Sequence, residues 1–352
     1  MTTSRATKLI KASLATLFYT GGHRVMAPFT QGVGVIFTLH HVSPEPRRAF
    51  EPNRILRITP EFLDRAISVV LDSGFDIVSL DDAHFRLTEG QFERPFACFT
   101  FDDGYRDNLV HAYPIFKRRN LPMAIYVPSA FADGEGDLWW LTLQTLIDSV
   151  DQLSVKMNGT SREFDCATSI AKEAAFDEIY WWLRNLDEHE ARGIVHELCR
   201  GAGVDWREHG RALPMSWDEL RRIAADPLVT IGSHTRQHYA LAKLTEAEAC
   251  QEIEIGTHRI EQELGRRPAH LCYPYGSPCA AGAREFRLAK ELGYKTAVTT
   301  RKGLIYSGHG EHLTALPRVS LNGDYQDERY LRVFLTGAPF AVWNGFRRIK
   351  VA

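Results

Sequence analysis

The sequence predicts an α/β protein in which strands and helices alternate, interrupted by one long insertion. Short apolar runs rich in β-branched residues recur along the chain. Amphipathic segments with helix start and stop signals separate them. Chemically active residues stand directly after several of the runs. With 352 residues, the chain can form one large domain with insertions or two smaller domains.

The overall composition is that of an ordinary globular protein. Apolar residues make up 44% and charged residues 24%, and the formal net charge is −2. A net charge this small gives no global basic field, so we expect no nucleic-acid partner. None of the six cysteines forms a C-x-x-C pair. We therefore expect reduced thiols and a cytoplasmic setting.

The first 30 residues form a segment of their own. No run reaches the ~18 apolar residues that span a bilayer. Residues Lys8 to Tyr19 combine basic residues with a short apolar face, and no small-residue cleavage site follows them. Three alternatives are open: a helix packed on the domain, a helix lying on a membrane surface, or an export signal.

Residues 31–130 show the first strands and helices. Thr59-Pro60 opens a helix, with Thr as N-cap, and Gly74 ends it. A second helix is expected over 108–119. The expected strands are Gly32–Leu39, Ile77–Leu80, Pro95–Phe101 and Met123–Val127.

Residues 131–214 break this rhythm and are predicted to be an inserted, mostly helical subdomain. A hairpin is expected over Leu153–Phe164, with Asn158-Gly159 as a type I′ turn, and helix over 173–186. Two tryptophan pairs, Trp139-Trp140 and Trp181-Trp182, are either core residues or platforms for sugar rings.

The rhythm resumes over residues 215–325, before a tail over 326–352. Capping boxes at Ser216 and Thr245 open two helices, and Gly293 ends a third, over Ala283–Leu292. The expected strands are Leu228–Gly232, Ala269–Tyr273, Thr296–Thr299 and Leu316–Ser320.

Four of the predicted strands end in chemically active residues. In a barrel of parallel strands all carboxyl ends open on one face, so these residues would share a pocket. His234 and His238 are spaced i, i+4, which brings both imidazoles within reach of one ion if the segment turns helically. Two histidines and a carboxylate are a common catalytic metal set. The four groups are His40-His41, Asp102-Asp103, Ser233-His234 with His238, and Tyr273-Pro274-Tyr275.

With these motifs, the chain resembles the polysaccharide deacetylases, the family of nodulation-type chitooligosaccharide deacetylases and of enzymes acting on peptidoglycan and poly-N-acetylglucosamine. Thr100–Gly104 matches the family's first motif, Ser233–His238 its second, and Tyr273–Gly276 most of its third. The likeness covers roughly residues 34 to 130 and 214 to 300. It implies a distorted (β/α)7 TIM-like barrel.

The resemblance also implies a set of roles. Asp103, His234 and His238 would hold a divalent metal, expected to be zinc, with Co2+, Mn2+ or Ni2+ as alternatives. Asp102 would be the general base, and a backbone N–H near Tyr275 would stabilise the oxyanion. The implied reaction releases acetate from an N-acetylated amino sugar of an envelope polysaccharide, a chitooligosaccharide or a lipid-linked glycan.

The sequence departs from the family at two points. Cys272 stands where an arginine usually orients the catalytic aspartate, and the late motif that carries the general acid has no match. His41, His309 and His312 are candidates for the acid, and we favour His41 for its place at a strand end. Two alternatives to the deacetylase therefore stay open: a catalytically impaired relative that binds carbohydrate, and a metal amidohydrolase for a non-sugar amide.

Overall fold

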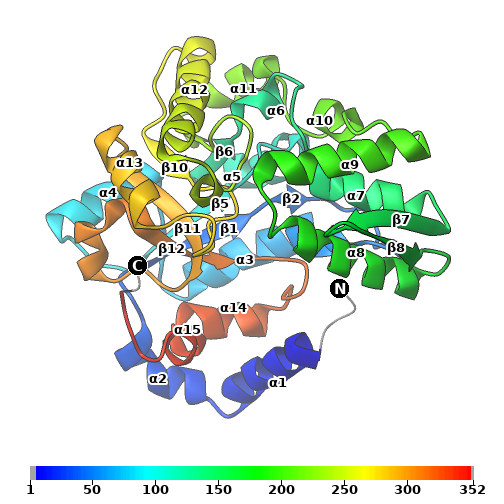
Figure 1. Cartoon of the computed structure of the whole chain (residues 1–352). Coiled ribbons are helices and arrows are strands. Elements are labelled where there is room, and N and C mark those ends of the chain that lie inside the picture. The colour runs from blue at the N-terminus through cyan, green and yellow to red at the C-terminus, as the bar shows by residue number, and fades with distance from the viewer. Residues whose placement is uncertain (1–4, 350–352) are drawn as a thin grey trace.

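The computed structural model describes residues 5–349 and contains a closed barrel of seven parallel strands (Figure 1). The strands follow the order β1-β12-β11-β10-β9-β6-β5 around the barrel, and β5 pairs with β1 to close it. This confirms the predicted (β/α)7 TIM-like barrel. The strands are β1 (Gly34–Leu39), β5 (Phe96–Phe101), β6 (Met123–Val127), β9 (Val229–Ser233), β10 (His270–Cys272), β11 (Thr296–Lys302) and β12 (Leu316–Ser320).

The strands are apolar throughout because both of their faces are covered. Every residue of β1, β5 and β6 is buried, as expected for parallel strands between a packed interior and a ring of helices. β1 and β5 are in register from Gly34 opposite Phe96 to Leu39 opposite Phe101. That register places the residues after Leu39 beside those after Phe101.

The helices around the barrel begin at the predicted capping residues. Ser216 and Thr245 form the two expected capping boxes, and Thr59 caps α3. The outer helices are α3 (Pro60–Asp72), α4 (Leu80–Glu89), α5 (Tyr113–Arg119), α11 (Trp217–Ala224), α12 (Glu246–Leu264) and α13 (Ala283–Glu291).

Two expected elements differ in their bounds. The strand predicted over Ile77–Leu80 is only β4 (Asp76–Ile77), which pairs beside the start of β5. Leu80 already belongs to α4, because Ser79 and Asp82 form a capping box in front of it. The helix predicted over 108–119 begins with a π-helical turn, Asn108–Ala112, before α5.

The insertion after β6 has a hydrophobic core of its own, which includes Trp139, Trp140 and Phe176. Asn158 and Gly159 both have positive φ, of 50° and 83°, as the type I′ turn requires. The elements are α6 (Ser129–Ala132), α7 (Trp139–Asp148), β7 (Gln152–Met157), β8 (Thr160–Asp165), α8 (Ser169–Leu183), α9 (Glu188–Ala202) and α10 (Glu208–Ala212).

Four helices from the two ends of the chain form one layer along an edge of the molecule (Figure 1). They are α1 (Arg5–Tyr19), α2 (Gly22–Thr30), α14 (Glu328–Leu335) and α15 (Ala338–Trp343). α1 contacts α14, and its Leu14 is buried in the barrel's outer core. Its apolar stripe therefore packs on the domain. Within residues 5–349, no helix has the length and apolar character needed to cross a bilayer.

The remaining short elements connect these layers. β2 (His41–Val42) and β3 (Arg57–Ile58) pair in parallel beyond the end of β1. The 3-10 turns are Pro52–Leu56, Leu241–Lys243, Ser307–Glu311 and Leu313–Ala315.

Candidate metal centre and active site

Asp103, His234 and His238 converge at the carboxyl ends of β5 and β9. One carboxylate oxygen of Asp103, Oδ1, lies 3.5 Å from Nε2 of His234 and 3.3 Å from Nε2 of His238. All three side chains are buried. The ligand atoms of the three residues lie within 4.8 Å of one another, close enough to bind a single ion.

The backbone is strained around these residues. Asp103, Thr235, His238 and Tyr275 all have φ between 60° and 70°, in the left-handed region that non-glycine residues rarely adopt. Gly276 shares that region, and a Cβ there would lie 2.5 Å from the Thr300 nitrogen. Such strain persists only where surrounding structure holds it, and it clusters at functional sites.

The chemistry of this trio fits a divalent cation. Oδ1 of Asp103 has no hydrogen-bond partner among the described residues. Burial and the neighbouring Asp102 carboxylate raise the pKa of Asp103 to about 8. Nδ1 of His234 donates to the carbonyl oxygen of Cys272 at 2.7 Å, so the lone pair of its Nε2 is free to face Asp103. A buried carboxylate opposite two neutral imidazoles is a donor set that zinc prefers.

Asp102 is held by an arginine that the motifs do not reveal. Nη1 of Arg318 donates to Oδ1 of Asp102 and Nη2 donates to Oδ2, both at 2.7 Å. Burial opposes ionisation of Asp102, but the Arg318 guanidinium outweighs it and holds the pKa of that carboxyl well below its usual value. Arg318 lies on β12 and replaces the arginine that was expected at Cys272.

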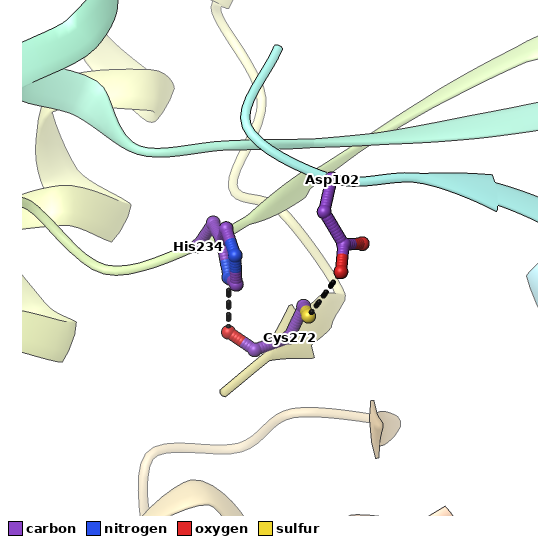
Figure 2. Close-up of side chains that lie close together, drawn as sticks. All are labelled: Asp102, His234 and Cys272. Carbon is purple, nitrogen blue, oxygen red and sulfur yellow. Dashed lines mark hydrogen bonds between the residues drawn. The ribbon is translucent and has the colours of Figure 1, made fainter. Parts of the chain in front are cut away.

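Cys272 contacts both Asp102 and Arg318. Figure 2 shows its sulfur facing Asp102 and its carbonyl oxygen facing the ring of His234. Asp102, His234 and Cys272 would also be close enough to bind an ion. The Arg318 guanidinium, however, occupies both oxygens of Asp102 and lies 3.2 Å from Sγ of Cys272. Its positive charge disfavours a cation there, so the trio around Asp103 is the better metal site.

A cavity of about 610 Å³ opens over the trio. Its floor is the barrel, with Asp102, Asp103, His234 and His238 among the lining residues. One of its walls is α8 of the insertion. The residues that α8 and the turn after it contribute are Phe176, Asp177, Tyr180, Trp181, Arg184 and Asn185.

Of the two adjacent histidines after β1, His40 lines the cavity and His41 does not. Nε2 of His40 is 4.0 Å from Oδ2 of Asp102. Desolvation lowers the pKa of His40 to about 4, so its imidazole is neutral at neutral pH. His41 instead pairs through Nδ1 with Asp107 at 2.7 Å and stacks on Tyr105. Adjacent residues of an extended chain point to opposite sides, and the β1–β5 register puts His40 beside Asp102.

The other two histidines considered for the acid lie elsewhere. His309 is buried in the 3-10 turn Ser307–Glu311, where its Nδ1 accepts from the Tyr306 N–H at 3.0 Å. His312 directly follows that turn. Neither lines the cavity.

Tyr275 joins the barrel to the insertion. Its hydroxyl accepts from Nε1 of Trp139 at 2.9 Å, and the Arg184 guanidinium stacks 3.5 Å above its ring. Its carbonyl oxygen accepts from Oγ1 of Thr300 at 2.6 Å. Its own N–H donates to no other described residue, so it is available as the donor that the sequence motif predicts.

Part of the chain matches a known protein family. Residues 170–297 match the family model described as polysaccharide deacetylase, a segment that includes the second and third motifs. No curated protein sequence matches the chain at a significant level.

Two solved structures have a similar fold. The Streptococcus pyogenes deacetylase PplD, in complex with acetate, is 16% identical, with a TM-score of 0.53 over 82% of this chain and 92% of its own. IcaB from Ammonifex degensii is 17% identical, with a TM-score of 0.52 over 86% and 97%. The family match supports the resemblance to polysaccharide deacetylases over residues 170–297, and the two solved structures show that the fold is similar.

Proposed function

We propose that this protein is a metal-dependent N-deacetylase that releases acetate from an N-acetylated amino sugar of a glycan. The observation that carries the proposal is the convergence of Asp103, His234 and His238 beside an arginine-held Asp102. A single cavity gives a substrate access to all four.

The metal would be held by Asp103, His234 and His238, and zinc is the ion we expect from one carboxylate and two imidazoles. When bound, it supplies Lewis-acid polarisation of the amide carbonyl and a lowered pKa for the attacking water. Every other part of the reaction is assigned to the chain's own residues.

Asp102 takes the proton of the attacking water, since Arg318 keeps its carboxyl ionised. The water oxygen bonds to the amide carbon, and the Tyr275 N–H stabilises the oxygen that becomes negative. The C–N bond then breaks as the nitrogen receives a proton. We propose that this is the proton that Asp102 took from the water, and that His40 passes it to the nitrogen, because His40 lines the cavity and its Nε2 lies 4.0 Å from Oδ2 of Asp102. The products are acetate and the free amine.

The insertion supplies the groups that would hold the sugar. Trp181 lines the cavity and leaves 53% of its surface exposed, so a sugar ring can stack on it. Asp177 and Asn185 lie along the same wall and offer hydrogen bonds to hydroxyl groups. The cavity volume lies in the range of sites that enclose a small ligand. We therefore propose that a short saccharide, or the end of a longer one, is the substrate.

The test combines metal analysis of the purified chain with acetate release. The panel contains N-acetylglucosamine oligomers, poly-N-acetylglucosamine, peptidoglycan fragments and small acetamides. We expect one metal ion per chain and acetate from at least one glycan. Asp103→Asn should lose both metal and activity, whereas Asp102→Asn should keep the metal and lose the activity.

Three outcomes would contradict the proposal. Full activity without metal would remove the metal from the reaction. Stoichiometric metal without hydrolysis of any substrate would favour a carbohydrate-binding relative. Turnover of small acetamides alone would favour a non-sugar amidohydrolase.

A further inference from the structure

The two ends of the chain are basic, whereas the rest is acidic. Residues 1–44 and 329–352 contain none of the 44 acidic residues and nine of the 42 lysines and arginines. The remaining residues therefore carry 33 basic and 44 acidic side chains, a net charge of −11. The nine are Arg5, Lys8, Lys11, Arg24, Arg329, Arg332, Arg347, Arg348 and Lys350. A segregation of charge this strong indicates an anionic partner for the ends.

The fold brings parts of both ends together. α2 packs against α15, and Oγ1 of Thr30 donates to the carbonyl oxygen of Thr336 at 2.7 Å. Nη2 of Arg348 donates to the carbonyl oxygen of Phe29 at 3.1 Å. Figure 1 shows α2 and α15 side by side, although some 300 residues separate them in the sequence.

Large apolar side chains are exposed on this pair of helices and on the segment after α15. Each exposes between 60% and 73% of its surface. The Lys302 ammonium lies 4.2 Å from the ring of Trp343. We call this surface the terminal face; it consists of Val25, Phe29, Val342, Trp343 and Phe346, with the exposed basic residues Arg24, Arg347 and Arg348.

The terminal face lies away from the catalytic cavity. α2 ends at Thr30, and β1 begins at Gly34, so this part of α2 sits at the amino end of the barrel strand. Asp103 and the histidines follow the carboxyl ends of β5 and β9. A flat partner on the terminal face would therefore leave the cavity open on the other end of the barrel.

We propose that the terminal face docks the protein onto the surface of a membrane that contains anionic lipids. Exposed apolar and aromatic side chains enter the interfacial region, and basic side chains beside them pair with lipid phosphates. A second copy of this chain is a poorer occupant, because a two-fold contact would place the arginines of two terminal faces against each other. An acidic protein would match the charge, but the cluster of exposed apolar and aromatic groups beside the arginines suits the interfacial region of a bilayer better.

The test is cosedimentation of the full chain with vesicles of phosphatidylcholine alone and with 30% phosphatidylglycerol. We expect at least tenfold stronger binding to the anionic vesicles and its loss in 0.5 M salt. Arg347→Gln with Arg348→Gln should lower the partition coefficient roughly 25-fold, at about fivefold per charge. Phe29→Ser with Trp343→Ser should lower it at least tenfold.

Matched controls are Arg222→Gln and Ile170→Ser, which remove an exposed charge and an exposed apolar group elsewhere. Both should bind like the parent chain, and thermal unfolding checks that each variant is folded. The arginine variant changes only exposed groups, so it tests the proposal even if the apolar variant does not fold. Equal vesicle binding by the parent and the arginine variant would overturn the proposal. Absence of binding to anionic vesicles would also overturn it. Dimers that the same variants disrupt would then identify a second copy of this chain as the occupant of the terminal face.

Discussion

Arg318→Met tests whether Arg318 keeps Asp102 ionised. Both side chains are almost fully buried, and the substitution removes two charge-assisted hydrogen bonds to Asp102. Breaking a buried ion pair on one side costs about 3–5 kcal/mol of folding free energy. Burial, which raises the pKa of Asp102, would then be opposed only by the weaker influence of His234 and His40. The carboxyl would be protonated at neutral pH, and we expect kcat at pH 7 to fall at least ~100-fold.

The assay is kcat against pH on a glycan that the parent chain deacetylates, with urea unfolding at pH 7. In Arg318→Met the acid limb of the profile should move up by about 3 pH units, so that part of the activity returns in alkaline buffer. Arg301→Met, a partly buried arginine that donates to Ala281 and not to Asp102, is the control and should keep the limb in place.

An exchange of positions sharpens the test. Sγ of Cys272 lies 3.2 Å from Nη2 of Arg318 and 3.6 Å from Oδ2 of Asp102. The side chains of Cys272 and Arg318 therefore lie next to each other beside the same carboxylate. Relative to Arg318→Met, the double variant Cys272→Arg with Arg318→Cys should regain part of the activity. The acid limb of its kcat–pH profile should move back toward lower pH. A folded Arg318→Met protein with an unchanged acid limb would refute the reasoning.

Three further predictions concern the site. His40→Gln should lower kcat about 100-fold at unchanged metal content. His41→Gln should lower kcat less than about threefold. A larger loss of kcat in His41→Gln than in His40→Gln would contradict the placement of His40. In chelator, urea unfolding should show that the stability of the parent chain relative to Asp103→Asn falls by about 1.5 kcal/mol between pH 6.5 and 8. Asp103 binds its proton up to about pH 8 when folded and only to about pH 4 when unfolded, so stability falls as pH rises. The histidines with lowered pKa gain stability over the same range in both proteins, so their contribution cancels in the difference. Trp181→Ala should raise KM roughly tenfold with little change in kcat, and the exposed Trp343→Ala, away from the cavity, should leave KM unchanged.

The sequence by itself determined the strands, most helix starts and the residues of the candidate metal site. Apolar runs such as Phe96–Phe101 and capping residues such as Ser216 act locally, so they can be read without the fold. Asp103, His234 and His238 were predictable because each follows a strand, and parallel strands in a barrel end on one face.

The tertiary structure decided the partners of those residues. Arg318 reaches Asp102 across 216 residues, and only closure of the barrel through β12 brings them together. The choice between His40 and His41 depends on a one-residue strand register, which a single strand's sequence does not reveal. The wall of α8 and the terminal face likewise join segments far apart in the chain. Local physics fixed the elements and the motifs, whereas long-range packing fixed which charges and surfaces meet.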